Sequence, residues 1–597
     1  MPIGSLFDTP GCAMPLYPLF HKTIRHANQT DISLRWRCPG RRATVVYRRG
    51  RALYLNVTRL SEYYGVESAA HAVCTYREVL RNETSGVPHD MGYKLGPSQT
   101  MNFGENLDEE FVAVECVAGI ETLFTDYFFI PQLKNISDGK AGKPRKGLMN
   151  VLVLGIDSTS RMNFNRHMKR TRQFLLGELN AFELLGYNKV GDSSFGNQIP
   201  LLLGKPADEV KRIFRERNLD DLPLLWNLYS ALGYATLFLE EMPCYGLFTY
   251  PNYRGFCKPP TDYYPVPILH AMEENGGIDI YCAGSRLKTQ VLLEYLRDVL
   301  ELNADHGIPL FSYVWLSDIP HSNDHALLVL DDPVHDLLRN MQKRRAFRDT
   351  VLVMLSDHGA RFGSNRATVI GRHEDKTPFG YLVLPRSFLS RHPGAAVNLE
   401  VNQRRLVTAY DVHSTLVDLL RYTSSASEAS LTANRGLSLL DQVPPHRSCS
   451  DAFVPIEFCE CIGAGAYLDE QSSHVQSFAK FLVEYLNSLN EANFPTMCAR
   501  WQLGSVTDAY VLDGRWSSVI TMRVVIVTQP VAHFEAYGEV HDGNEEWRVL
   551  FVQRLDCEGW GEGETAGMPS AMDDSTRRDH ASFVLEISRA CSAADVG

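Results

Sequence analysis

Short apolar runs alternate with amphipathic stretches through the middle of the chain. The runs at 150–156, 235–239, 309–316, 351–355 and 379–384 are nearly uninterrupted. Such runs are typical of strands that are buried on both faces. Apolar residues recur at helical spacing over 171–185, 224–232, 289–302, 333–341 and 406–422. The alternation predicts an α/β fold with a mostly parallel central sheet and helices on both of its faces.

The regions that flank this pattern differ from it. Residues 1–147 contain four cysteines, short mixed runs at 43–47 and 52–57, and a polar basic segment at 138–147. They predict a disulfide-containing accessory region. Beyond a Ser/Ala-rich segment at 423–430, strand-like runs at 518–527 and 547–552 predict a small antiparallel domain. We therefore expect an accessory region at 1–147, a catalytic core at 148–445 and a Cys-containing, β-rich domain at 446–597.

The length of the chain and its net charge limit which domain organisation and which ligands are expected. A chain of 597 residues is too long for one hydrophobic core, which agrees with several domains. The net charge of −12 gives no electrostatic support for a nucleic-acid partner. An anionic substrate would need local positive charge, such as a metal ion, to offset that field.

Cysteines and glycosylation sequons point to an oxidising compartment. None of the 13 cysteines forms a CxxC pair, and we expect Cys449, Cys459 and Cys461 to form disulfides. N-x-S/T sequons occur at Asn28, Asn56, Asn82 and Asn135. No signal-peptide pattern or membrane-spanning run is seen. We expect a secreted or secretory-lumen protein whose export signal is missing from this sequence; an intracellular protein with unused sequons is the alternative.

Polar residues follow two of the predicted buried strands. Asp157 follows the run at 150–156, and Asp357-His358-Gly359 follows the run at 351–355. Ligands bind at the carboxyl ends of strands in open α/β sheets. A lone Asp after a strand is more often a helix cap or a turn former. Two carboxylates and an imidazole at such ends instead favour a divalent metal such as Zn²⁺.

Ser194 is the candidate nucleophile. It lies at the expected start of a helix, where the amide groups and the helix dipole favour anions. In the simpler interpretation, Ser193 or Ser194 is only an N-cap. A serine hydroxyl can be activated by metal coordination, so Ser194 would also be a metal ligand. Asn197, three residues later, could donate a hydrogen bond to a substrate oxygen.

A weaker set of candidate ligands follows the other strands. Asp318 and His321 come after the run at 309–316, and His373 precedes the run at 379–384. The charged residues around His373 are equally consistent with a solvated turn. His413 lies within the predicted helix at 406–422 and is expected to be a packing or surface residue.

Together these motifs resemble the alkaline phosphatase superfamily. The nearest resemblance is to a sulfatase-like animal family of extracellular proteins that is catalogued only as a domain of unknown function. The resemblance spans about residues 12 to 461 and rests on six motifs: Cys12-Ala-Met-Pro15, Gly155-Ile-Asp-Ser-Thr-Ser-Arg161, Asn188-Lys-Val-Gly-Asp-Ser-Ser-Phe195, Thr261-Asp-Tyr-Tyr264, Ser356-Asp-His-Gly-Ala-Arg-Phe-Gly363 and Cys449 to Cys461. It implies that Asp157, Ser194, Asp357 and His358 hold one metal ion, with Asp318, His321 and His373 as the weaker set for a second.

Three departures from the superfamily patterns bear on this assignment. The chain has Ser194-Phe195-Gly196-Asn197 where phosphodiesterases usually have Thr-Phe-Pro-Asn, and Gly196 is expected to loosen the helix start. No formylglycine motif occupies the nucleophile position, so sulfatase activity by the usual route is not expected. Asp318 and His321 are one residue closer than in two-zinc phosphodiesterases, which leaves one ion, as in phosphoethanolamine transferases, as an alternative to two.

The hypothesis is a metal-dependent hydrolase or transferase that acts on a phosphoric ester through a covalent serine intermediate. The divalent metal would be zinc, as one or two ions. Its substrate would be a small-molecule, glycan-linked or lipid-linked ester. The alternatives are a sulfuric ester hydrolase-like protein or a catalytically degenerate extracellular binding protein.

Overall fold

A computed structural model describes residues 2–24, 44–83, 90–136, 148–275, 281–283, 286–322, 326–362, 365–366, 368–423, 435–461, 466–493, 500–512, 519–541 and 546–555. The chain divides into two compact units by its internal contacts. Unit 1 comprises Met1–Ala27, Ala360–Lys376 and Pro445–Gly597, and unit 2 comprises Asn28–Gly359 and Thr377–Pro444. The three-part division at 147 and 445 stays a prediction. The segment at 138–147, residues 424–430 and the sequon at Asn28 lie outside the described residues.

Unit 2 is built on a six-stranded sheet. Its strand order is β11-β18-β17-β10-β16-β13. The strands are β10 (Asn150–Ile156), β11 (Phe182–Glu183), β13 (Ala235–Glu240), β16 (Leu310–Leu316), β17 (Thr350–Leu355) and β18 (Gly380–Val383). Strand β10 pairs in parallel with β16 and β17, and β13 pairs in parallel with β16. Only the contacts of β18, with β17 and β11, are antiparallel. The predicted mostly parallel sheet is confirmed.

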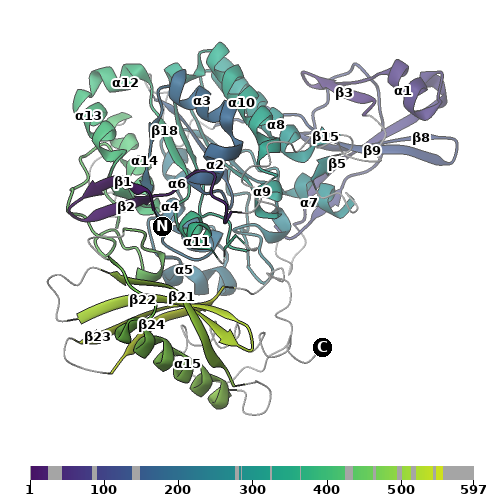
Figure 1. Cartoon of the computed structure of the whole chain (residues 1–597). Helices are drawn as coiled ribbons and strands as arrows, with labels where there is room; N and C mark the ends of the chain where they lie inside the picture. Colours follow the sequence, from purple (N-terminus) through teal and green to yellow (C-terminus); the bar gives the residue numbers. More distant parts are fainter. Residues whose placement is uncertain are drawn as a thin grey trace. The chain divides into compact units, whose positions relative to one another are not determined.

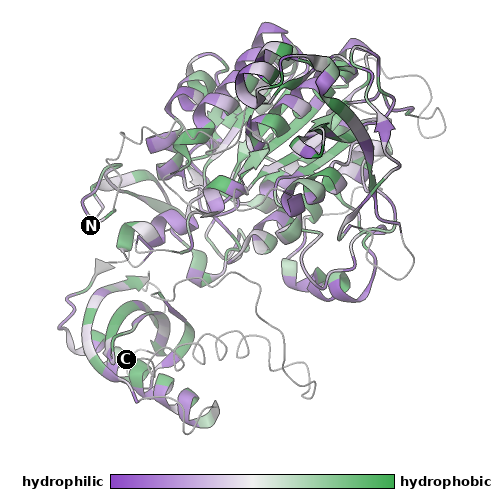
Figure 2. Cartoon of the chain, turned by 90° about the vertical axis from the view of Figure 1, so that its right-hand side faces the viewer, coloured by the Kyte–Doolittle hydropathy of each residue, from purple (hydrophilic) through white to green (hydrophobic). Residues whose placement is uncertain are grey.

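The two faces of this sheet carry separate hydrophobic cores. Successive side chains of a strand point to opposite faces. Val151 and Val153 therefore join one core, while Leu152 and Leu154 join the other. Figure 2 shows these central strands as apolar. The predicted helices on both faces are thus confirmed.

Different helices pack on each face of the sheet. Residues of the first core come from α4 (Ser194–Leu203), α5 (Ala207–Glu216), α6 (Leu225–Ser230), α12 (Arg386–Arg391), α13 (Pro393–Asn402) and α14 (Ala409–Thr423). Residues of the second come from α2 (Arg161–His167), α3 (Lys169–Gly177), α7 (Val266–Asn275), α8 (Lys288–Asp305), α9 (Asp318–Ser322) and α10 (Leu328–Lys343). None of the helices in the described ranges is long and apolar enough to cross a membrane.

Two expected helices in unit 2 are shorter than predicted. The helix expected at 171–185 ends at Gly177, and residues 182–183 form β11 because they bond to the edge of β18. The helix expected at 406–422 begins at Ala409. Leu406–Val407 instead forms β19, which pairs with β12 (Gly186–Tyr187). In both cases the termini follow the hydrogen bonds of a distant strand, which local periodicity does not contain.

The amino-terminal part of unit 2 is β-rich. Its elements are β3 (Val46–Arg49), β4 (Ala52–Leu55), α1 (Val57–Tyr64), β5 (Val73–Arg81), β6 (Tyr93–Leu95), β7 (Gln99–Thr100), β8 (Phe111–Ala118) and β9 (Glu121–Phe129). Strands β5, β8 and β9 form an antiparallel ribbon (Figure 1). A disulfide joins Cys74 to Cys116 across β5 and β8. The short pair β14 (Cys282–Ala283) and β15 (Arg286–Leu287) precedes α8.

Unit 1 contains the predicted antiparallel domain. Its five-stranded sheet comprises β20 (Ala466–Tyr467), β21 (Gln502–Leu512), β22 (Val519–Gln529), β23 (His533–His541) and β24 (Arg548–Arg554). Helix α15 (Ser473–Asn493) packs on one face of this sheet (Figure 1). The hairpin β1 (Gly4–Thr9) and β2 (Cys12–Leu16) and helix α11 (Val369–Lys376) complete the unit. The expected disulfides are confirmed as Cys449–Cys459 and Cys12–Cys461.

His413 gives unit 2 a defined dependence on pH. It is buried in α14, and its Nδ1 lies 2.9 Å from the Leu201 carbonyl oxygen in the last turn of α4. Burial lowers the pKa of His413 from 6.5 to about 4, although the bond to Leu201 opposes this shift. Between those pH values the unfolded chain binds more protons than the folded chain. Stability contributed by neutral His413 is therefore complete above about pH 6.5 and is lost as the pH falls toward 4.

We expect His413→Gln to remove this part of the pH dependence, because the amide keeps a donor and does not titrate. Lowering the pH from 7 to 5 should cost the wild-type chain about 2 kcal/mol more of its unfolding free energy than it costs the variant. Urea unfolding of both proteins at the two pH values measures this difference. Equal losses in the two proteins would show that His413 does not titrate as stated.

Candidate metal and nucleophile site

Strand pairing brings the two polar strand ends together. Gly155 of β10 lies opposite Leu355 of β17 in the parallel register, so Asp157 and Asp357 follow neighbouring strands at the same edge. Ligand atoms from Asp157, Asp357 and His358 all lie within 4.8 Å of one another. All three residues are buried. The structure therefore places these predicted ligands in one cluster.

Hydrogen bonds between the strand ends hold the carboxylates in place. The Ser158 amide donates to Asp357 Oδ1 at 3.2 Å, and the Ser158 hydroxyl donates to Asp157 Oδ1 at 2.9 Å. Ser158 has a φ of 52°, a left-handed conformation that is uncommon outside glycine. The Thr159 amide donates to Ser356 Oγ at 2.9 Å. These bonds join the β10 and β17 ends directly, and they fix one oxygen of each acid.

The His358 ring faces Asp357 on one side and the Gly359 carbonyl on the other. Its Nδ1 lies 2.8 Å from the Gly359 carbonyl oxygen, which can only accept, so Nδ1 carries the proton. Its Nε2 is then an acceptor, 3.5 Å from Asp357 Oδ2. Asp357 Oδ2 is buried and has no hydrogen-bond donor. Two buried acceptors that face each other need a cation between them or a proton donor.

Ser194 lies next to this cluster. It is the first residue of α4, and its Oγ is 3.3 Å from His358 Nε2. Ser193 is the N-cap residue, but its side chain makes no capping hydrogen bond. The partial positive charge of the helix N-terminus favours an anion at the Ser194 position. Of the two serines, Ser194 is therefore the one whose hydroxyl reaches the predicted ligands.

Asn197 contacts the backbone before the nucleophile. Its Oδ1 accepts from the amides of Val190 and Gly191 at 2.8 and 3.1 Å. Its Nδ2 donates to the carbonyls of Gly191 and Ser193 at 2.8 and 3.0 Å. The two amide protons expected to serve a substrate oxygen are thus used within the protein. We infer that Asn197 is a positioning residue that shapes the turn before Ser194.

Gly196 allows a close backbone approach at the helix start, and whether it also loosens that start stays a prediction. A Cβ on Gly191 would lie 2.6 Å from the Gly196 Cα, and a Cβ on Gly196 would lie 3.0 Å from the Gly191 Cα. The two glycines therefore allow the turn and the first helical turn to pack backbone against backbone. This close approach lets Asn197 reach across the turn.

Asp318 and His321 lie in α9, after β16, as the sequence predicted. Asp318 forms a buried ion pair with Lys288, the first residue of α8. Lys288 Nζ also lies 3.8 Å from Glu273 Oε1. Burial alone would lower the pKa of Lys288, but the Asp318 and Glu273 carboxylates raise it. Lys288 therefore places an amine next to Asp318, where it would compete with a second metal ion.

His373 belongs to unit 1 and has a carboxylate partner there. Its Nδ1 lies 2.9 Å from Glu460 Oε2, and its ring packs against Tyr17. Burial alone would raise the pKa of Glu460, but Lys376 and His373 lower it to about 2. The charged segment around His373 is buried in α11, so the alternative of a solvated turn is wrong.

Two acids of the site region, Glu240 and Glu241, were not predicted from the sequence. Glu240 ends β13 and Glu241 follows it, so the strand-end rule that selected Asp157 would also have selected them. Burial raises the pKa of Glu240 to about 8. The carboxylates of Asp157 and Asp357 add to this shift, and the hydrogen bonds from the Leu247 amide oppose it. Glu241 Oε2 accepts from the amides of Ser317 and Asp318. Lys288 carries no local signal, because its role arises from contacts with distant residues.

Solved structures with detectable similarity include three bacterial proteins. The C-terminal periplasmic domain of EcEptC from Escherichia coli is 12% identical over 51% of this chain and 92% of that chain, with a TM-score of 0.35. The lipoteichoic acid synthase LtaP from Listeria monocytogenes is 13% identical over 52% and 79%, with a TM-score of 0.34. The PsFucS1 sulfatase from Pseudoalteromonas sp. is 12% identical over 68% and 84%, with a TM-score of 0.33. No curated protein sequence matches the chain.

Family membership is shown by sequence. A family model described as "Protein of unknown function (DUF229)" matches residues 44–507. This range contains every predicted ligand as well as Ser194 and Asn197. It covers more than half of the chain, and we conclude that the chain belongs to this family.

Proposed function

We propose that the protein is a metal-dependent hydrolase or transferase that acts on a phosphoric ester through a covalent serine intermediate. The observation that carries the proposal is the position of Ser194. Its Oγ lies 3.3 Å from His358 Nε2, beside two buried carboxylates and at the start of a helix. The motif resemblance to the alkaline phosphatase superfamily supports the same chemistry.

The residues present fit a zinc ion. Asp157, Asp357 and His358 offer two carboxylates and a neutral imidazole, a donor set that Zn²⁺ accepts. The unpartnered Asp357 Oδ2 and the nearby His358 Nε2 are the atoms that a cation would contact. Ser194 would be the fourth residue of the set. A bound zinc ion would lower the pKa of the Ser194 hydroxyl and polarise the ester.

The proposed reaction has two steps. Ser194 Oγ attacks phosphorus as the bond from phosphorus to the leaving oxygen breaks. The serine proton is lost to solvent, and the leaving alcohol takes up a proton. Water or an acceptor alcohol then attacks the phosphoserine and regenerates the hydroxyl. The fixed turn at Asn197 and the α4 N-terminus orient Ser194 and favour the charge on the phosphoryl group.

We propose one metal ion rather than two. Lys288 already pairs with Asp318 in a buried site, so a second ion there would bring a cation close to an ammonium. His373 contributes its Nδ1 to Glu460 within unit 1. The substrate would be a small-molecule, glycan-linked or lipid-linked ester. The disulfides of both units support a secreted or secretory-lumen location.

The metal content tests the ligand assignment. We expect the purified protein to bind about one zinc ion per chain, and we expect Asp357→Asn to lose it, because an amide is a weaker ligand than a carboxylate. Asp318→Asn and His321→Ala should keep the ion. Mass spectrometry of the metal content, with circular dichroism as the check on folding, measures this. Retention of zinc by a folded Asp357→Asn variant would contradict the assignment.

The nucleophile is tested by a matched pair of serine variants. Ser194→Ala should lower the turnover of an activated phosphodiester or phosphomonoester by roughly 10³-fold or more, because the covalent step is lost. Ser193→Ala should stay close to wild type, because its side chain makes no capping bond. A chelator should abolish the wild-type rate. Turnover of a sulfate ester alone would favour the sulfuric ester alternative, and no turnover of any ester by the zinc-loaded protein would refute the proposed function.

A further inference from the structure

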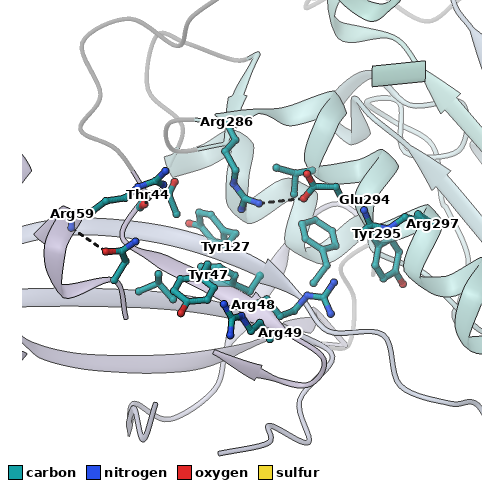
Figure 3. A pocket seen from close by; sticks show the side chains of 15 residues that line it. Thr44, Tyr47, Arg48, Arg49, Arg59, Tyr127, Arg286, Glu294, Tyr295 and Arg297 are labelled. Atoms are coloured by element: carbon teal, nitrogen blue, oxygen red, sulfur yellow. Dashed lines mark hydrogen bonds and ion pairs between the residues drawn. The ribbon is translucent and has the colours of Figure 1, made fainter. Parts of the chain in front are cut away.

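A cavity lies in the β-rich part of unit 2. It has a volume of about 550 Å³ and is lined by residues of β3, α1, β9, β15 and α8. Figure 3 shows Arg48, Arg49 and Arg59 on one side of it and Arg286 and Arg297 on the other. None of the residues that line it belongs to the predicted metal or nucleophile site. The cavity is therefore a separate feature.

The lining of this cavity is strongly basic. Its charged lining residues are five arginines (Arg48, Arg49, Arg59, Arg286 and Arg297) and one acid, Glu294. This is opposite in sign to the net charge of −12 on the whole chain. Burial lowers the pKa of Arg48, and so do its neighbours Arg297 and Arg286. Like charges held this close create a local positive potential that attracts an anion.

Carboxylates neutralise only part of this charge. Asp298 pairs with Arg48 and Arg297. Arg286 lies 3.5 Å from Glu294 and 4.0 Å from Asp126. Within the part of the chain that the structure describes, no carboxylate forms an ion pair with Arg49 or Arg59. Both side chains are exposed. Arg286 Nε is in addition a buried donor without a hydrogen-bond acceptor. Arg49, Arg59 and Arg286 thus have donor capacity for a ligand.

Aromatic rings complete the cavity. Tyr47 is 38% exposed, and its ring stacks on Tyr54 with the centroids 5.7 Å apart. The Arg49 guanidinium lies 5.3 Å from the centroid of Tyr47. A flat, exposed aromatic surface beside guanidinium groups suits a sugar ring that carries acidic substituents. The volume is far larger than a single sulfate or phosphate ion needs and lies within the range of small-ligand sites.

We propose that this cavity, named here the arginine cavity, binds a sulfated oligosaccharide. Arg49, Arg59 and Arg286 would donate to its sulfate groups, and Tyr47 would contact a sugar ring. The negative charge of the remaining chain would disfavour a long nucleic acid, whereas a short anionic glycan fits inside the basic surface. The site binds without chemistry, so it does not depend on the proposed reaction at Ser194.

Binding of a fluorescently labelled heparin hexasaccharide to the full chain tests the proposal. Fluorescence anisotropy should give a Kd that is about tenfold or more weaker for the double variant Arg49→Ala/Arg59→Ala, because charge-assisted hydrogen bonds are lost. The matched control is Arg212→Ala/Arg215→Ala, which removes the same charge from exposed positions of α5. Its Kd should stay within about twofold of wild type.

Further probes separate the ligand classes. The desulfated hexasaccharide should bind about tenfold or more weakly than the sulfated one, and Arg49→Lys/Arg59→Lys should restore part of the affinity. Equal loss in both alanine double variants would show a general charge effect and overturn the proposal. Unchanged binding by folded Arg49→Ala/Arg59→Ala would also overturn it. The proposal would also be overturned if single-stranded DNA bound as tightly as the hexasaccharide and lost affinity to the same extent in these variants.

Discussion

The site depends on buried acceptor atoms that face one another. The register of β10 and β17 forces Asp157, Asp357 and His358 together, and their ligand atoms lie within 4.8 Å of each other. Burying carboxylates in this way is unfavourable unless a positive charge or donors compensate. Backbone amides and serine hydroxyls satisfy one oxygen of each acid, and they leave Asp357 Oδ2 without a donor. The fold therefore leaves a buried acceptor that a cation or a proton donor could satisfy.

The placement of Ser194 follows from a different constraint, which is the shape of the turn before α4. Gly191 and Gly196 approach so closely that neither position can hold a larger residue without displacement. Asn197 then bonds to both the amides and the carbonyls of that turn. We therefore infer that Asn197, which was expected to contact the substrate, positions the turn instead. Packing fixes the position of Ser194, whereas the reactivity proposed for it would come from the neighbouring ligands.

The parts predicted from sequence are those with a local signal. Buried strands are visible in the sequence as apolar runs. The residues that follow parallel neighbouring strands meet at one edge of the sheet, so Asp157 and Asp357 could be paired across 200 positions. Lys288 has no such signal, because its partner Asp318 is brought to it by the fold. Nor could sequence show that His373 belongs with Glu460 in unit 1. The start of α14 likewise depends on a distant strand, β12.

The ion pair of Lys288 with Asp318 also affects how the acidic edge of the sheet can work. Glu240 interacts electrostatically with Asp157 and Asp357 of the candidate metal site, and also with Glu273, which lies beside Lys288. The candidate metal ligands and the acids around Lys288 therefore share one edge of the sheet. The Lys288 side chain belongs to α8, so a chelator cannot remove it and a metal ion cannot take its place by exchange. It also offers hydrogen-bond donors rather than an open coordination position. One side of the edge therefore carries Lys288 next to Asp318, whereas Asp357 Oδ2 beside His358 is buried without a hydrogen-bond donor. This asymmetry supports the proposal of a single exchangeable ion beside Ser194.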